Sequence, residues 1–109
     1  MSQETSVSAR IAQLQAEHGS LAHFVVGGQL FAFRKPTLEE WEDFQDSVST
    51  GRKKRGVAYR ELAMRCLVEP GDLDALAALF ERNPGFNARI GDALSDLAGA
   101  DLEVTVKKG

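Results

Sequence analysis

A short apolar segment, residues 31–35, runs directly into a segment with the signature of a capped amphipathic helix, residues 37–49. Thr37 and Glu40 have the spacing of a capping box, in which each side chain pairs with a backbone N–H that the helix terminus leaves free. Pro36 lies just before the cap, where its missing N–H costs nothing. The junction therefore predicts a strand that passes through a fixed turn into a helix.

The predicted helix carries large apolar side chains on one face and acidic side chains mostly on the other. The first carboxylates favour the positive N-terminus of the helix, and the rest are typical of a solvated face. We therefore interpret the acidic residues as helix surface rather than as a catalytic or metal-binding cluster. The apolar residues are Leu38, Trp41, Phe44 and Val48, and the acidic ones are Glu39, Glu40, Glu42, Asp43 and Asp46.

The N-terminal part predicts a helix followed by a β-hairpin. Residues 1–20 contain a weakly amphipathic helix with a narrow apolar stripe, and residues 21–35 contain two apolar runs separated by Gly27-Gly28. Two consecutive glycines suit a type I′ turn, which needs positive φ at both central positions.

Residues 37–99 predict a bundle of short helices, because apolar residues recur at helical spacing between Gly and Pro breaks. After the helix at 37–49, a second helix is expected to run to Val68, with Cys66 on its buried face. Asp72 is expected to cap a third helix, and Asn83 a fourth, with Pro84 at its first position. The expected inward stripes are Tyr59, Leu62, Ala63, Cys66 and Leu67, then Leu73, Leu76, Ala77 and Phe80, then Phe86, Ile90, Leu94 and Leu97.

These elements predict one domain, residues 1–109, of mainly α class: a small bundle of about four to five helices with an N-terminal β-hairpin. Residues 100–109 are expected to be a short edge strand or a loose tail. The net charge of −3 disfavours a dedicated nucleic-acid-binding domain. One cysteine, no signal-peptide pattern and no long apolar run lead us to expect a cytoplasmic protein without a membrane segment.

We find no convergent reaction chemistry, and we expect no enzyme activity, metal or cofactor. His18 and His23 lack further ligands at zinc spacing. The glycines around the basic segment have the separation of a phosphate loop, but Val57-Ala58 stand where that motif needs Lys and then Ser or Thr. This segment is expected to be a solvated loop, with contacts to an acidic partner as the alternative. Its cations are Arg52, Lys53, Lys54 and Arg55.

The strand at 29–35 is apolar on both faces, with Leu30 and Ala32 on one and Phe31 and Phe33 on the other. Two explanations remain open. The favoured one is that the N-terminal helix covers the second face, and the other is that this face binds a partner.

Three segments together resemble tail assembly chaperones of long-tailed bacteriophages and related prophages. Residues 33–41 are similar to their "phenylalanine–arginine–x–proline–threonine … tryptophan" junction. Residues 62–70 are similar to an apolar helix ending "cysteine–x–valine–x–proline", and residues 76–85 to a helix break at "proline–glycine". The resemblance spans residues 30–99 and does not include the N-terminal helix or the basic loop.

The resemblance implies a non-enzymatic protein of the host cytoplasm that keeps the helical tape-measure protein soluble until the tail-tube protein assembles around it, and that is absent from the mature virion. The tape-measure protein is thus the expected partner, with tail-tube protein and self-association as further options. The contact surface, or its immediate support, is expected at Phe31, Phe33, Trp41 and Phe44. The alternatives are a structural tail or virion component and a small regulatory nucleic-acid-associated module that uses the basic loop.

Overall fold

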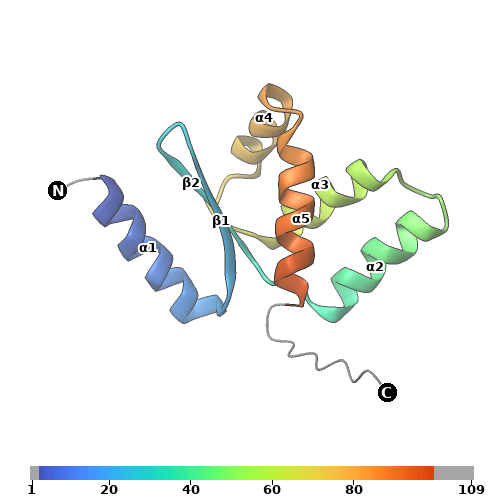
Figure 1. The fold of residues 1–109 in the computed structure, drawn as a ribbon, viewed down its shortest axis with the longest axis horizontal. Helices are drawn as coiled ribbons and strands as arrows, with labels where there is room; N and C mark the ends of the chain where they lie inside the picture. Colours follow the sequence, from blue (N-terminus) through green and yellow to red (C-terminus); the bar gives the residue numbers. More distant parts are fainter. Residues whose placement is uncertain (1–2, 100–109) are drawn as a thin grey trace, which may run out of the picture.

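The computed structural model describes residues 3–99, which form five helices and one three-stranded sheet (Figure 1). This confirms the predicted mainly α class with an N-terminal hairpin, while the predicted C-terminal tail at 100–109 lies outside the described residues. The helices are α1 (Gln3–His18), α2 (Leu38–Ser49), α3 (Arg55–Cys66), α4 (Leu73–Arg82) and α5 (Phe86–Ala98). The strands are β1 (Leu21–Val26), β2 (Gln29–Arg34) and β3 (Leu67–Glu69).

The sheet is antiparallel with the order β1-β2-β3, so β2 is its central strand. Gly27 and Gly28 connect β1 to β2 with φ values of 57° and 80°, as the predicted type I′ turn requires. Residues Leu21–Val26 then pair along their whole length with Gln29–Arg34.

The prediction that the helix before Pro70 continues to Val68 is wrong. That helix ends at Cys66, and the next three residues form β3, in which Leu67 pairs with Phe33 and Glu69 with Ala32. A residue that precedes proline is pushed toward extended backbone, which favours a strand up to Glu69. The apolar residues keep their helical spacing into this segment, so the sequence pattern does not show where the helix ends and the strand begins.

Helix α1 covers one face of the sheet (Figure 1). Leu14 is 1% exposed and packs in a cluster with Leu30 and Ala32 of β2. The Arg10 guanidinium also donates to the Glu69 carboxylate of β3 at 3.0 Å. The favoured explanation for the doubly apolar strand, coverage by the N-terminal helix, is therefore confirmed.

The other face of the sheet packs against α3, α4 and α5 to form the main core. Cys66 is buried there as predicted, and burial raises the pKa of its thiol to about 11, so it stays protonated and unreactive at neutral pH. The inward stripe predicted for α5 is also confirmed, since all four of its members are buried. Those residues are Phe86, Ile90, Leu94 and Leu97.

The apolar stripe of α4 and the start of α5 differ from the prediction, whereas Asp72 caps α4 as predicted. Leu73 is 51% exposed whereas Leu79 is 1% exposed, because α4 turns its middle and C-terminal part toward the core. Asn83 does not begin α5: its N–H bonds to the Leu79 carbonyl and ends α4. Its own carbonyl accepts the N–H of Phe86, so the segment between the helices is a turn and Gly85 is the cap of α5.

None of the helices within residues 3–99 is both long and apolar enough to cross a membrane.

We expect Leu14→Ala to lower the free energy of unfolding by about 2–4 kcal/mol, because it leaves a cavity between α1 and the sheet. Leu38→Ala is the matched control, since the Leu38 side chain is 75% exposed. It should change that free energy by less than about 0.5 kcal/mol. Urea denaturation followed by circular dichroism measures both. Equal effects of the two substitutions would contradict the docking of α1 on β2.

Candidate functional site

The turn between β2 and α2 is fixed by a capping box and an ion pair. The Thr37 hydroxyl accepts the Glu40 N–H at 3.2 Å, and the Glu40 carboxylate accepts the Thr37 N–H at 2.9 Å, which confirms the predicted box. The Arg34 guanidinium donates twice to the same carboxylate, at 2.8 and 2.9 Å. It also donates to the carbonyl of Arg65 near the end of α3, at 2.9 Å. The junction thus holds β2, α2 and α3 together.

Glu40 is a structural anion rather than a proton donor. Its hydrogen bonds with Arg34, followed by the hydrogen bonds with Thr37, lower the pKa of its carboxyl from 4.5 to about 2, against the opposing effect of burial. The same pairing raises the pKa of Arg34. Both groups therefore remain charged throughout the neutral and mildly acidic range.

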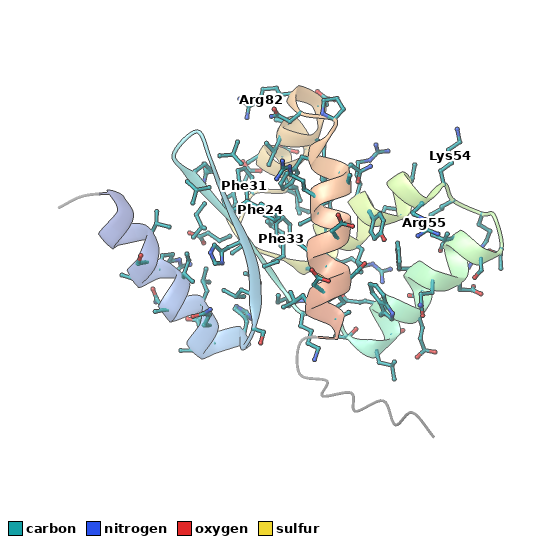
Figure 2. All side chains as sticks on the ribbon, in the orientation of Figure 1. Phe24, Phe31, Phe33, Lys54, Arg55 and Arg82 are labelled. Atoms are coloured by element: carbon teal, nitrogen blue, oxygen red, sulfur yellow. The ribbon has the colours of Figure 1, made fainter. Side chains whose placement is uncertain are left out.

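Phe31 and Phe33 do not form a contact surface. They are 3% and 0% exposed, and Figure 2 places them with Phe24 between the hairpin and α5. Phe24 meets the edge of Phe33 at 6.4 Å between ring centroids and that of Phe86 at 5.0 Å. The expectation that Phe31 and Phe33 touch a partner directly is thus wrong, because the face that carries them is the one that packs against the helices. They can only support a surface elsewhere.

Trp41 and Phe44 line an open groove that α2 forms with α3 and α5, and we call this the aromatic groove. Both rings are half-buried, with centroids 5.1 Å apart, and Val48 lies one turn further along the helix. The groove has a volume of about 400 Å³ and also includes residues of α3 and α5. Leu38, expected on the same buried face, is 75% exposed at the start of the helix.

Tyr59 of α3 completes the aromatic groove and was not among the expected site residues. Its ring stacks on Phe44 at 4.7 Å, and its hydroxyl lies 3.5 Å from the hydroxyl of Ser95. A methyl group at Gly91 would lie 2.8 Å from the Tyr59 ring, so the absence of a side chain there lets the ring pack onto α5. The helical spacing assigned Tyr59 to the core stripe and gave no sign of its partial exposure.

The basic loop is partly neutralised by the protein itself. Arg52 forms an ion pair with Asp46, and Lys53 forms one with Glu61. Figure 2 shows Lys54 and Arg55 at the start of α3, where Lys54 points outward. Exposed ion pairs are weak, so an acidic partner could displace them, but the four cations are not a free basic patch.

Comparisons with known proteins place the fold and leave the activity open. A family model described as "Domain of unknown function (DUF6848)" matches residues 26–107. The structure of an uncharacterised protein, rbstp2171 from Bacillus stearothermophilus, is similar with a TM-score of 0.63 and 21% identity, and the match covers 89% of this chain and 99% of that chain. At this identity the likeness shows a shared fold. A search of curated proteins found no match.

We expect Glu40→Gln to lower the free energy of unfolding at pH 7 by about 1–3 kcal/mol, because it removes charge-assisted hydrogen bonds to Arg34 and Thr37. The pKa of Glu40 is lower in the folded protein than its ordinary value, so this contribution is present above pH 4.5 and is lost as the pH falls toward 2. The difference between wild type and Glu40→Gln should therefore shrink over that interval in urea titrations.

Glu39→Gln is the control for this experiment, since it removes the same charge from the same turn at an exposed position. Its effect on the free energy of unfolding at pH 7 should be small, within about 0.5 kcal/mol. If both variants lost stability equally, the Arg34–Glu40 pair would not be what fixes the junction.

We expect Gly91→Ala to destabilise the protein by about 1–2 kcal/mol, because the added methyl group displaces the Tyr59 ring. In a Tyr59→Ala background the same change should be neutral or stabilising, because alanine is the better helix former. A double-mutant cycle from denaturation curves measures this coupling. An identical effect of Gly91→Ala in both backgrounds would contradict the contact.

Proposed function

Because the chain belongs to the DUF6848 family, whose description assigns no function, we propose a function from its own residues. The proposal is that this protein is a tail assembly chaperone that binds the tape-measure protein of a long-tailed bacteriophage and keeps it soluble during tail-tube assembly. It would act in the cytoplasm of the bacterial host and leave before the virion is complete.

The aromatic groove is the observation that carries this proposal. It lies within the segment that resembles tail assembly chaperones, and it brings three rings from two helices to one half-exposed surface. An amphipathic helix binds in such a groove by inserting apolar side chains spaced three or four residues apart. The tape-measure protein, which the resemblance describes as long and helical, would offer many such stretches.

The shape of the groove suits reversible binding. It is open and shallow, with a volume of about 400 Å³, so it accepts only a few side chains of a client helix. Small interfaces of this kind are typical of transient complexes. A chaperone that must yield its client to the tail-tube protein needs many weak contacts along the client rather than one tight one.

The buried aromatic core gives the groove a rigid base. Trp41 and Phe44 pack against the cluster that contains Phe31 and Phe33, so the residues expected from the resemblance divide into two contact residues and two support residues. Rigid rings lose little conformational entropy when they bind, which makes them efficient contact residues.

The nucleic-acid alternative has less support from the same surface. Arg52 and Lys53 are paired with carboxylates of the chain, and the net charge is −3. The structural-component alternative differs from the chaperone in one outcome: a tail component would be present in purified particles, and a chaperone would not.

We expect Leu38→Glu to reduce recovery of the tape-measure protein in co-expression pull-downs by about tenfold, the effect of losing ~1.4 kcal/mol of binding free energy. Leu38 is 75% exposed and lies one turn before Trp41 on α2, so the substitution charges the rim of the groove without disturbing the core. The client is the tape-measure protein encoded by the same phage or prophage.

Leu73→Glu is the matched control, because it introduces the same charge at an exposed leucine of α4, away from the aromatic groove. It should leave recovery unchanged. The proposed function would be refuted if wild-type protein neither solubilised nor retained the tape-measure protein. An equal loss with both variants would refute the groove as the binding surface.

A further inference from the structure

Among residues 3–99, Arg55 is the one charged residue that lines the aromatic groove. It begins α3, and Figure 2 shows it on the side of that helix toward α2, whereas the neighbouring Lys54 points outward. The other lining residues are apolar, aromatic or uncharged polar, such as Gln45 and Ser95. A single cation therefore gives an otherwise neutral groove an electrostatic preference for anionic groups.

Arg55 is also available for a partner. Within the part of the chain that the structure describes, it forms no ion pair, because the carboxylates of Asp46 and Glu61 are already paired with the two cations at residues 52 and 53. Asp92 of α5 lines an adjoining groove of about 490 Å³ together with Arg55, but the two residues form no ion pair there. A carboxylate from another molecule would therefore not have to displace an existing partner of Arg55.

The aromatic rings and Arg55 lie toward opposite ends of the groove. Residues 50–54 connect the end of α2 to the start of α3, so Val48 and Arg55 lie near this connection and Trp41 lies farther from it. Tyr59, which stacks on Phe44, is four positions after Arg55 on α3, a rise of about 6 Å. A client helix has the same rise. The residue that meets the rings and the residue that reaches Arg55 would thus be three or four positions apart.

We propose that the aromatic groove selects helical segments in which an aspartate or glutamate follows or precedes an apolar stripe by one turn, and that Arg55 binds this carboxylate. A guanidinium can donate two parallel hydrogen bonds to a carboxylate, which fixes the relative position of the two groups. The inference rests on the proposed function, because it specifies which stretches of the tape-measure protein the groove would hold.

The apolar contacts and the charge have different effects on binding. Insertion of apolar side chains between the rings of Trp41, Phe44 and Tyr59 would supply most of the affinity, since an exposed ion pair contributes little. The pair with Arg55 would instead set the register, because a helix with a uniform apolar stripe could bind in several positions along the groove. A client with repeated stripes would then be held at defined places.

Peptide titrations test the preference on the full chain. The probes are three amphipathic peptides of about 18 residues, long enough to form a helix, that share one apolar stripe and contain no tryptophan. They differ only one turn beyond the stripe, where they carry Glu, Gln or Lys. Trp41 is the one tryptophan of the protein and lies in the groove, so its fluorescence reports binding. The Glu peptide should bind about threefold more tightly than the Gln peptide, and the Lys peptide about threefold more weakly.

Arg55→Glu should reverse this order, so that the Lys peptide binds most tightly. Lys54→Glu is the matched control, because it makes the same change of charge at the adjacent position, where the side chain points outward. It should leave the order unchanged at physiological ionic strength, at which charges more than about 8 Å apart are largely screened. Both substitutions place a carboxylate at the N-terminus of α3, which the helix dipole favours, so both variants should fold.

The outcomes separate this inference from the proposed function. Equal binding of the Glu and Lys peptides to wild type, or the same order with Arg55→Glu as with Lys54→Glu, would overturn the inference and leave the chaperone proposal standing. No change in Trp41 fluorescence with any peptide would overturn the groove as a helix-binding site. If wild type preferred the Glu peptide but did not retain the tape-measure protein in co-expression, the chaperone function alone would be refuted. Dimers in sedimentation that Arg55→Glu dissociates would overturn the inference by assigning the groove to a second copy.

Discussion

The hydrogen-bonded ion pair between Arg34 and Glu40 decides where α2 can lie. Helix α2 has no buried residue and packs mainly on α3, so burial alone would fix its position poorly. One carboxylate serves both as the partner of Arg34 and as half of the capping box with Thr37. Because Arg34 also reaches the Arg65 carbonyl, the end of the sheet, the start of α2 and the end of α3 are set by one cluster. The aromatic groove exists only while that arrangement holds.

The sheet explains why the hairpin is core rather than contact surface. Four consecutive residues of β2, 30–33, are buried, two beneath α1 and two beneath the other helices. A lone hairpin is marginal in water, and here α1 and β3 supply what it lacks. With both faces covered, the doubly apolar strand β2 needs no partner to bury its side chains.

Local signals in the sequence predicted most of the elements. The capping box at Thr37, the glycine turn and the stripe of α5 each depend on residues within a few positions of one another, and each is confirmed. Strand β3 depends on pairing with β2, which lies more than 30 positions earlier in the sequence. It has three residues, which are too few to show the alternation of side chains that identifies a strand. The exposure of Leu38 and Leu73 likewise depends on which parts of their helices other elements cover, and spacing along one helix does not encode this.

The candidate site, too, was predictable only where its residues depend on local sequence patterns. Trp41 was singled out because it follows the capped junction, and that local inference placed it correctly on α2. Tyr59 carries equal weight in the groove, but its role depends on the close approach of α3 to Gly91 of α5. A half-exposed ring and a buried ring give the same periodic pattern in the sequence. The pattern shows on which side of the helix a residue lies, but it does not show how deeply that side is buried. Partial exposure of large rings is therefore a tertiary property. For Trp41 and Phe44 it arises because α2 packs mainly on α3, whereas α3 and α5 each pack on several elements.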